Sequence, residues 1–137
     1  MKNLLRFLFV AFVALSSCKK AIEDTKKNIL LGMITNGQWY VESFKEADAD
    51  ITDNFTGFLF SFEENGTVTG SRQNESHSGT WEGVISTYSI ISEFPAAGEP
   101  LIKLNGTWKV KDSAEDYVLA EKQADSATSV LKLRKKP

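Results

Sequence analysis

From Gly37 to the C-terminus, apolar and polar residues alternate with a period of two, and turn residues recur about every ten positions. This combination is typical of an antiparallel β-sandwich or barrel. The pattern predicts about nine short strands, at Gln38–Lys45, Phe55–Glu63, Thr67–Gln73, Ser78–Val84, Thr87–Ser92, Leu101–Leu104, Thr107–Lys111, Tyr117–Lys122 and Ser129–Arg134.

The clearest of these strands is Phe55–Glu63, where three phenylalanines alternate with other residues and should all face the core, namely Phe58, Phe60 and Phe62. Asn65-Gly66 follows this strand and predicts a type I′ hairpin, because both central residues of that turn need a positive φ. In the last strand, Leu131 and Leu133 are expected to face inward.

Upstream of the strands, apolar residues recur at near-helical spacing, at Ile22, Ile29, Met33 and Ile34. Asn36-Gly37 then supplies a stop signal. We therefore expect a short helix of about two to three turns that leads into the first strand. The segment before it, Lys19–Lys27, is polar and charged, as expected of a tether.

The first residues have the composition of a secretion signal. Lys2 and Arg6 precede the apolar run FLFVAFVAL, which is well short of the ~20 residues that span a bilayer. Leu15-Ser16-Ser17-Cys18 comes next and resembles the lipobox of bacterial lipoproteins: an aliphatic residue, two small residues and a cysteine. The alternative is an ordinary signal peptide with a chance cysteine.

The lipobox resemblance implies that the Cys18 thiol carries a diacylglyceryl group, that the chain is cut before it, and that the new amine is acylated with a fatty acid such as palmitate. Two or more acyl chains hold a protein firmly on a membrane. Lys19 stands where an aspartate would resemble an inner-membrane retention signal, so we expect the outer membrane of a gram-negative envelope. The domain boundaries expected are signal peptide 1–17, lipidated tether and short helix 18–36, and barrel 37–137.

Composition narrows the function further. Removal of 17 residues from the 137 leaves 120, enough for one domain. Because Lys2 and Arg6 leave with the signal, 14 basic and 18 acidic residues remain, a formal charge of −4 that argues against nucleic acid as a partner. Cys18 is the only cysteine, so the mature chain holds no internal disulfide and must rest on its core. We expect a monomer.

All three tryptophans lie in Gly-x-Trp triplets, which are Gly37-Gln38-Trp39, Gly79-Thr80-Trp81 and Gly106-Thr107-Trp108. A glycine permits a tight turn or bulge, after which the second strand residue fills the core. The three indoles are expected to stack at one end of a barrel and close it.

A Gly-x-Trp in the first strand after a short helix resembles the lipocalin signature. The wider arrangement resembles small lipocalin-like bacterial lipoproteins over residues 36–134, in the segments GQWYVESF, FTGFLFSFEENGTVTG, SGTWEG and NGTWKV. The resemblance implies an all-β, antiparallel up-and-down barrel of about eight strands. A β region of only ~100 residues implies a small or filled cavity, since eight-stranded barrels are just wide enough to be packed solid or to hold one small ligand.

Two functions fit this resemblance. In the first, the barrel binds a small hydrophobic ligand, with its aromatic residues as the candidate ligand site: Trp39, Phe58, Phe60, Trp81, Tyr88 and Trp108. In the second, the barrel is packed, and the protein acts on another envelope protein through its longest irregular segments, Ala47–Asn54 and Phe94–Pro100. Cavity volume separates the two.

The sequence carries little sign of catalysis or metal binding. His77 is the only histidine and lies in a polar stretch, which is too little for a zinc site or a nucleophile–base pair. Asp48, Asp50 and Asp53 are dense but do not match an EF-hand loop, so a solvated acidic loop is expected. We expect no enzyme, no cofactor and no metal.

Two triplets, Asp112-Ser113-Ala114 and Asp125-Ser126-Ala127, resemble the acceptor of O-glycosylation systems in some gram-negative envelopes. Both lie in predicted turns, which an enzyme could reach. Ser113 and Ser126 are therefore candidate glycosylation sites.

Overall fold

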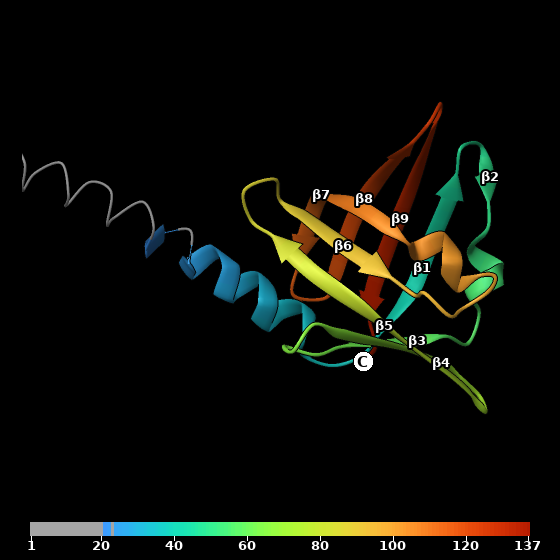
Figure 1. The fold of residues 1–137 in the computed structure, drawn as a ribbon, viewed down its shortest axis with the longest axis horizontal. Helices are drawn as coiled ribbons and strands as arrows, with labels where there is room; N and C mark the ends of the chain where they lie inside the picture. Colours follow the sequence, from blue (N-terminus) through green and yellow to red (C-terminus); the bar gives the residue numbers. More distant parts are fainter. Residues whose placement is uncertain (1–20, 23) are drawn as a thin grey trace, which may run out of the picture.

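The computed structural model describes residues 21, 22 and 24–137, and these form a closed eight-stranded antiparallel barrel with one short helix at its N-terminus (Figure 1). The wall consists of β1 (Trp39–Glu46), β3 (Leu59–Phe62), β4 (Thr67–Arg72), β5 (Glu75–Val84), β6 (Ser89–Glu93), β7 (Gly106–Ala114), β8 (Tyr117–Ala124) and β9 (Ala127–Lys135). A two-residue strand, β2 (Ala49–Asp50), and the 3₁₀ helices η1 (Thr52–Phe55) and η2 (Leu101–Leu104) lie in the connections. The expected fold class is confirmed.

Each wall strand pairs with the next one along the chain, and the pairing of β1 with β9 closes the barrel. The junction of β1 with β3 is much thinner, because only Trp39 and Phe60 pair there. η1 fills the space beside it: Phe55 stacks on Phe44 with ring centroids 5.2 Å apart, and the Thr52 hydroxyl accepts a hydrogen bond from the Phe44 N–H at 2.9 Å.

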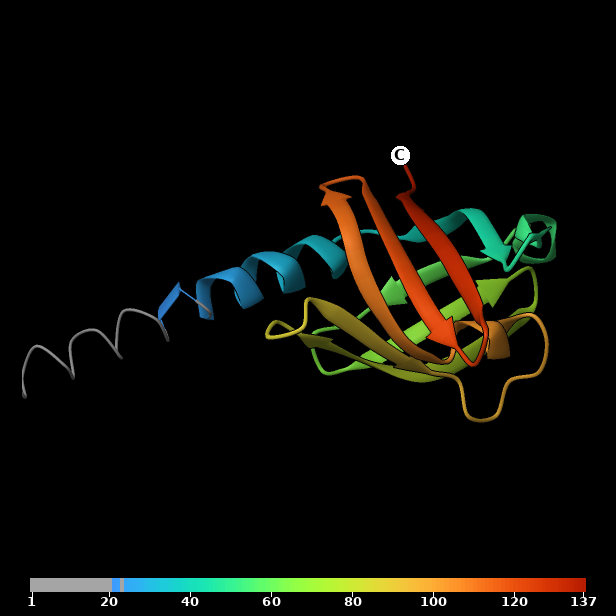
Figure 2. The ribbon, with the colours of Figure 1, turned by 90° about the horizontal axis from the view of Figure 1, so that it is seen from above.

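The two ends of the barrel differ in character. The helix end carries the N-terminal helix and the turns β3–β4, β5–β6 and β7–β8, while the loop end carries β2, η1, the β6–β7 connection with η2, and the β8–β9 turn (Figure 2). Both irregular segments singled out in the sequence, Ala47–Asn54 and Phe94–Pro100, therefore lie at the loop end.

The N-terminal helix covers residues 24–34, with 21 and 22 also helical, so the expected helix is confirmed. Its buried face includes only one of the apolar residues that predicted the helix. Leu30 and Ile34 are buried against the barrel, whereas Ile22 and Ile29 are 57% and 64% exposed. No helix among the described residues is long and apolar enough to cross a membrane.

Two local predictions were wrong. Leu101–Leu104 is the 3₁₀ helix η2 and not a strand; its buried residues, Leu101 and Leu104, are three apart, which matches one 3₁₀ turn. The β3–β4 turn is not type I′, because Gly66 has a positive φ (89°) and Asn65 does not. The Asn65 side chain instead accepts a hydrogen bond from the Thr67 N–H, and the Gly66 N–H bonds the Glu63 carbonyl, which is the pattern of a type I turn followed by a bulge.

The core is built as the alternation predicts. Phe58, Phe60 and Phe62 are buried, as are Leu131 and Leu133 on β9, which flanks β1 on its other side. Phe58 stands just before β3, since η1 occupies the front part of the strand predicted from Phe55.

The side chain of Phe60 needs a glycine opposite it. Phe60 pairs with Gly70 on β4, and a Cβ at Gly70 would lie 2.9 Å from the Phe60 ring. The ring thus lies directly over the partner backbone, where only glycine leaves room for it.

We expect Phe60→Ala to lower the free energy of unfolding by about 3–5 kcal/mol, because it removes a large buried ring and leaves a cavity. Chemical denaturation followed by tryptophan fluorescence measures the loss. Leu59→Ala, on the neighbouring residue that points away from the core, is the control and should cost much less. Equal losses for the two variants would contradict the assignment of strand faces.

Candidate functional site

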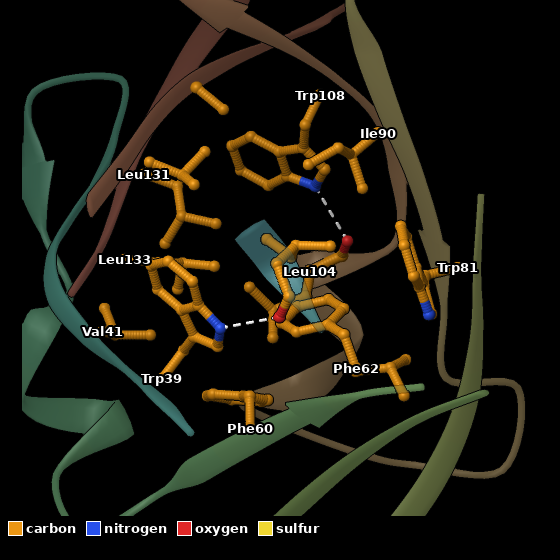
Figure 3. Packing of buried hydrophobic residues seen from close by; sticks show 14 of the residues in the cluster. Trp39, Val41, Phe60, Phe62, Trp81, Ile90, Leu104, Trp108, Leu131 and Leu133 are labelled. Carbon is orange, nitrogen blue, oxygen red and sulfur yellow. Dashed lines mark hydrogen bonds between the residues drawn. The ribbon is translucent and has the colours of Figure 1, made fainter. Parts of the chain in front are cut away.

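The interior of the barrel is the first candidate for a ligand site, and it is almost completely filled. A cavity of about 50 Å³ remains, among residues from six strands and the β6–β7 connection (Figure 3). Its lining residues are Phe60, Phe62, Val68, Ile90, Ser92, Phe94, Leu104, Trp108, Val118, Ala120, Leu131 and Leu133. Ligand pockets usually measure about 300–1,000 Å³, so this space fits a few water-sized groups and no fatty acid.

The six candidate ligand residues do not share one pocket. Phe60 and Trp108 line the cavity, while Trp39, Phe58 and Trp81 are buried in the surrounding core. Tyr88, expected in the pocket wall, lies instead on the outside: its side chain is 43% exposed and its hydroxyl lies 3.4 Å from the Ser113 Oγ. The reason is the β5–β6 turn, where Tyr88 takes a positive φ of 51° and turns away from the interior.

The three indoles are not stacked at one end, in contrast to the expectation. Each donates its N–H to a different backbone carbonyl: Trp39 to Ile34 at 2.9 Å, Trp81 to Glu63 at 2.9 Å, and Trp108 to Leu104 at 2.8 Å. Figure 3 shows the three rings at separate places around the core. Trp39 and Trp81 therefore belong to the helix end, and Trp108 to the loop end.

The glycines of the three triplets also differ. Gly37 and Gly106 have positive φ values of 82° and 120°, as a turn before a strand requires. Gly79 lies inside β5, and a Cβ there would collide with the Glu93 carbonyl oxygen and press on Phe94. In the first and third triplets the glycine thus permits a turn before the strand, whereas in the second it leaves room for the backbone of the neighbouring strand.

The interior offers no unused polar group. The Ser92 hydroxyl donates to the Leu104 carbonyl at 2.5 Å. Within the described part of the chain, every buried side-chain nitrogen and oxygen has a hydrogen-bond partner. Ligand sites normally place a few polar groups to orient the ligand, and no such group points free into this cavity.

The loop end is irregular in backbone but firmly fixed. Phe94, Leu101 and Leu104 are buried and anchor the β6–β7 connection in the core. From β8, the Lys122 ammonium donates to the Lys103 carbonyl at 2.8 Å and to the Asn105 carbonyl at 2.7 Å. These two bonds close the end of η2, where carbonyls lack helical partners.

Lys122 is a structural lysine that the sequence pattern does not single out. Its ammonium also lies 4.7 Å from the centroid of the Trp108 ring, a cation–π distance. Burial lowers the pKa of Lys122, because desolvation disfavours the charged form. Its position in β8, two residues after the buried Ala120, is on the core-facing side of the strand.

One further contact ties η2 to β1, and another lies within the other irregular segment. Lys103 on η2 bonds Glu46 on β1 at 3.0 Å, and this hydrogen bond raises the pKa of Lys103. The Asp50 carboxylate accepts from both the hydroxyl and the N–H of Thr52, which lowers the pKa of Asp50. The acidic loop is thus held in part by its own hydrogen bonds.

The loop end also exposes apolar surface. Ile102 on η2 is 46% exposed, and Pro95, Ala96 and Glu99 beside it are exposed as well. A fixed loop surface with apolar side chains is a common form of protein interaction site.

His77, the only histidine, contacts an acidic residue on the same hairpin. The His77 Nε2 lies 3.1 Å from Glu75 Oε1 on the β4–β5 hairpin, and Arg72 approaches the same carboxylate at 3.4 Å. In the described ranges, no three His, Cys, Asp or Glu side chains gather as they would around a metal ion.

The remaining site predictions concern modification. Ser126 is exposed in the two-residue β8–β9 turn, beside Asp125 with its positive φ of 51°, whereas Ser113 is half-buried at the end of β7. Both stay candidate glycosylation sites, with Ser126 the more accessible. Cys18 and the signal peptide 1–17 lie outside the described residues.

Comparison with known proteins supports the fold alone. No protein-family model matches the chain, and no curated protein matches it. Among solved structures, a DUF4847 family protein from Bacteroides vulgatus ATCC 8482 is similar, with a TM-score of 0.59 and 17% sequence identity. The match covers 79% of this chain and 99% of that one.

Proposed function

We propose that this chain is a lipid-anchored, lipocalin-like barrel of the gram-negative cell envelope that acts through its loop end on another envelope protein. The observation that carries the proposal is the division of the barrel into a filled interior and a fixed, partly apolar loop surface. A ligand-binding barrel would need the reverse, an open interior.

The lipid anchor is supported by the resemblance of Leu15-Ser16-Ser17-Cys18 to a lipobox. Cys18 precedes the helix by only a few residues, so a lipid there lies near the helix end of the barrel. The loop end then lies at the end of the barrel opposite the anchor, where another envelope protein can reach it.

Anchoring makes a direct prediction. Cys18→Ala removes the acceptor thiol, and we expect the variant to accumulate unprocessed or wrongly cut and to leave the carbonate-washed outer-membrane fraction. Membrane fractionation with immunoblotting measures this. Ser17→Ala keeps a small residue before the cysteine and is the matched control, which should stay anchored. If Cys18→Ala stayed in the membrane fraction to the same extent as the wild-type protein, the lipid assignment would be contradicted.

A filled interior predicts no binding of large apolar ligands. Titration of the purified protein with fatty acids, retinoid-like compounds and a hydrophobic dye should give no saturable change in the fluorescence of the buried tryptophans. Native mass spectrometry of protein from its host should likewise show no small molecule retained.

The positive control for that titration is Leu131→Ala, which enlarges the same cavity and should admit a benzene-sized compound. A saturable response of the wild-type protein to a fatty acid would instead support the ligand-binding function, with Phe60 and Trp108 as its contacts.

The loop surface predicts a site-specific partner. A photo-crosslinking amino acid at Ile102 should give a defined adduct with an envelope protein in intact cells. The same group at Ile91, an isoleucine on β6 that is 38% exposed, is the matched control and should give none. Lys122→Met, which removes the donors that hold η2, should weaken the Ile102 adduct. Equal adducts at Ile91 and Ile102 would argue against the loop end as the interaction site.

A further inference from the structure

We infer that the outer face of the N-terminal helix, together with the β5–β6 turn, is a membrane-contact surface that rests on the bilayer to which Cys18 tethers the chain. This inference depends on the proposed lipid anchor. It adds a second, non-covalent contact with the membrane and an orientation of the barrel upon it.

The helix has two apolar stripes, and the barrel uses only one of them. Leu30 and Ile34 are one turn apart and buried against the barrel. The second stripe consists of Ile22, Lys26, Ile29 and Met33, whose spacings of four, three and four residues place them on one face. Its two isoleucines are 57% and 64% exposed, and nothing in the described residues covers them.

This second stripe continues onto the barrel. A groove of about 510 Å³ lies between the helix residues Ile29 and Met33 and the β5–β6 turn residues Ile85 and Tyr88. At the start of the helix, Ile22 extends the exposed apolar face. The apolar surface therefore runs from the first turn of the helix to the rim of the barrel.

Its polar residues suit a membrane interface. Lys26 lies within the stripe, and its apolar stem can lie along the isoleucines while its ammonium reaches lipid phosphates. Tyr88 is half exposed at the edge, with an apolar ring and a polar hydroxyl, the combination enriched where membranes meet water. A helix with this distribution lies in the plane of the interface.

The short tether favours the bilayer, over a second copy of the chain or another protein, as the occupant of this surface. Only residues 19 and 20 separate Cys18 from the described helix at Ala21, and three residue steps span at most about 10 Å. A lipid on Cys18 thus keeps the start of the helix within about 10 Å of the bilayer surface at all times. A second copy or another protein would have to arrive by diffusion and displace the lipid.

The test places a fluorophore on each end of the barrel. The mature lipoprotein, with Ile29→Cys labelled by an environment-sensitive dye, is reconstituted in phosphatidylethanolamine–phosphatidylglycerol vesicles that contain brominated acyl chains. We expect a blue shift and a severalfold stronger quenching than at Ile102→Cys. Ile102 is the matched control, an exposed isoleucine at the loop end.

A second variant keeps the test independent of the label at residue 29. Ile22 and Ile29 are exposed, so Ile22→Asn with Ile29→Asn should leave the melting temperature unchanged. The same pair should reduce, severalfold, the lipid quenching of a dye at Ser86→Cys in the groove.

The outcomes separate the failure of this inference from that of the lipid anchor. Equal quenching at residues 29 and 102 in vesicle-bound protein overturns the membrane-contact surface. Protection at residue 29 that rises with the protein-to-lipid ratio also overturns it and indicates pairing of two copies. If Cys18 carries no lipid, each chain takes up dye at two thiols instead of one and does not float with the vesicles.

Discussion

The indole N–H groups of Trp39 and Trp108 hold the two ends of the barrel in place. Trp39 opens β1 and donates to the carbonyl of Ile34, the last residue of the helix; Trp108 enters β7 and donates to Leu104, the last residue of η2. In both cases the indole binds a carbonyl that the helix itself leaves unpaired. A buried aromatic ring thus supplies core volume and positions a surface element at the same time.

The same aromatic residues explain why the interior is filled. Short strands enclose a narrow barrel, and the Phe44 ring meets both Phe55 and Trp108, at 5.2 and 5.6 Å. Phe62 packs edge-on against Trp81 at 5.6 Å. With the rings in contact with one another, little space is left for a ligand. The surfaces left open for contact are therefore the two ends of the barrel.

Alternation in the sequence predicted most of the wall, because a strand with one face in the core must repeat with a period of two. It failed where burial is achieved without a strand: Leu101 and Leu104 are buried through one 3₁₀ turn. For the helix, the apolar spacing predicted that a helix forms. It did not predict which face packs on the barrel, because the helix carries a second apolar stripe besides Leu30 and Ile34. Alternation places Lys122 on the same face of β8 as the buried Val118 and Ala120. Its acceptors, the carbonyls of Lys103 and Asn105, could not be predicted, because only the fold brings them near.

The placement of the two surfaces has a mechanical consequence. A nine-residue strand such as β7 extends for about 26 Å at ~3.3 Å per residue, and strand tilt shortens this to about 20 Å along the barrel axis. A partner at Ile102 would therefore lie about 20 Å from the helix end of the barrel. Since each wall strand pairs with its neighbours and β1 with β9 closes the barrel, the two ends are held in place relative to each other. A membrane contact at one end and a protein contact at the other would then not compete for surface.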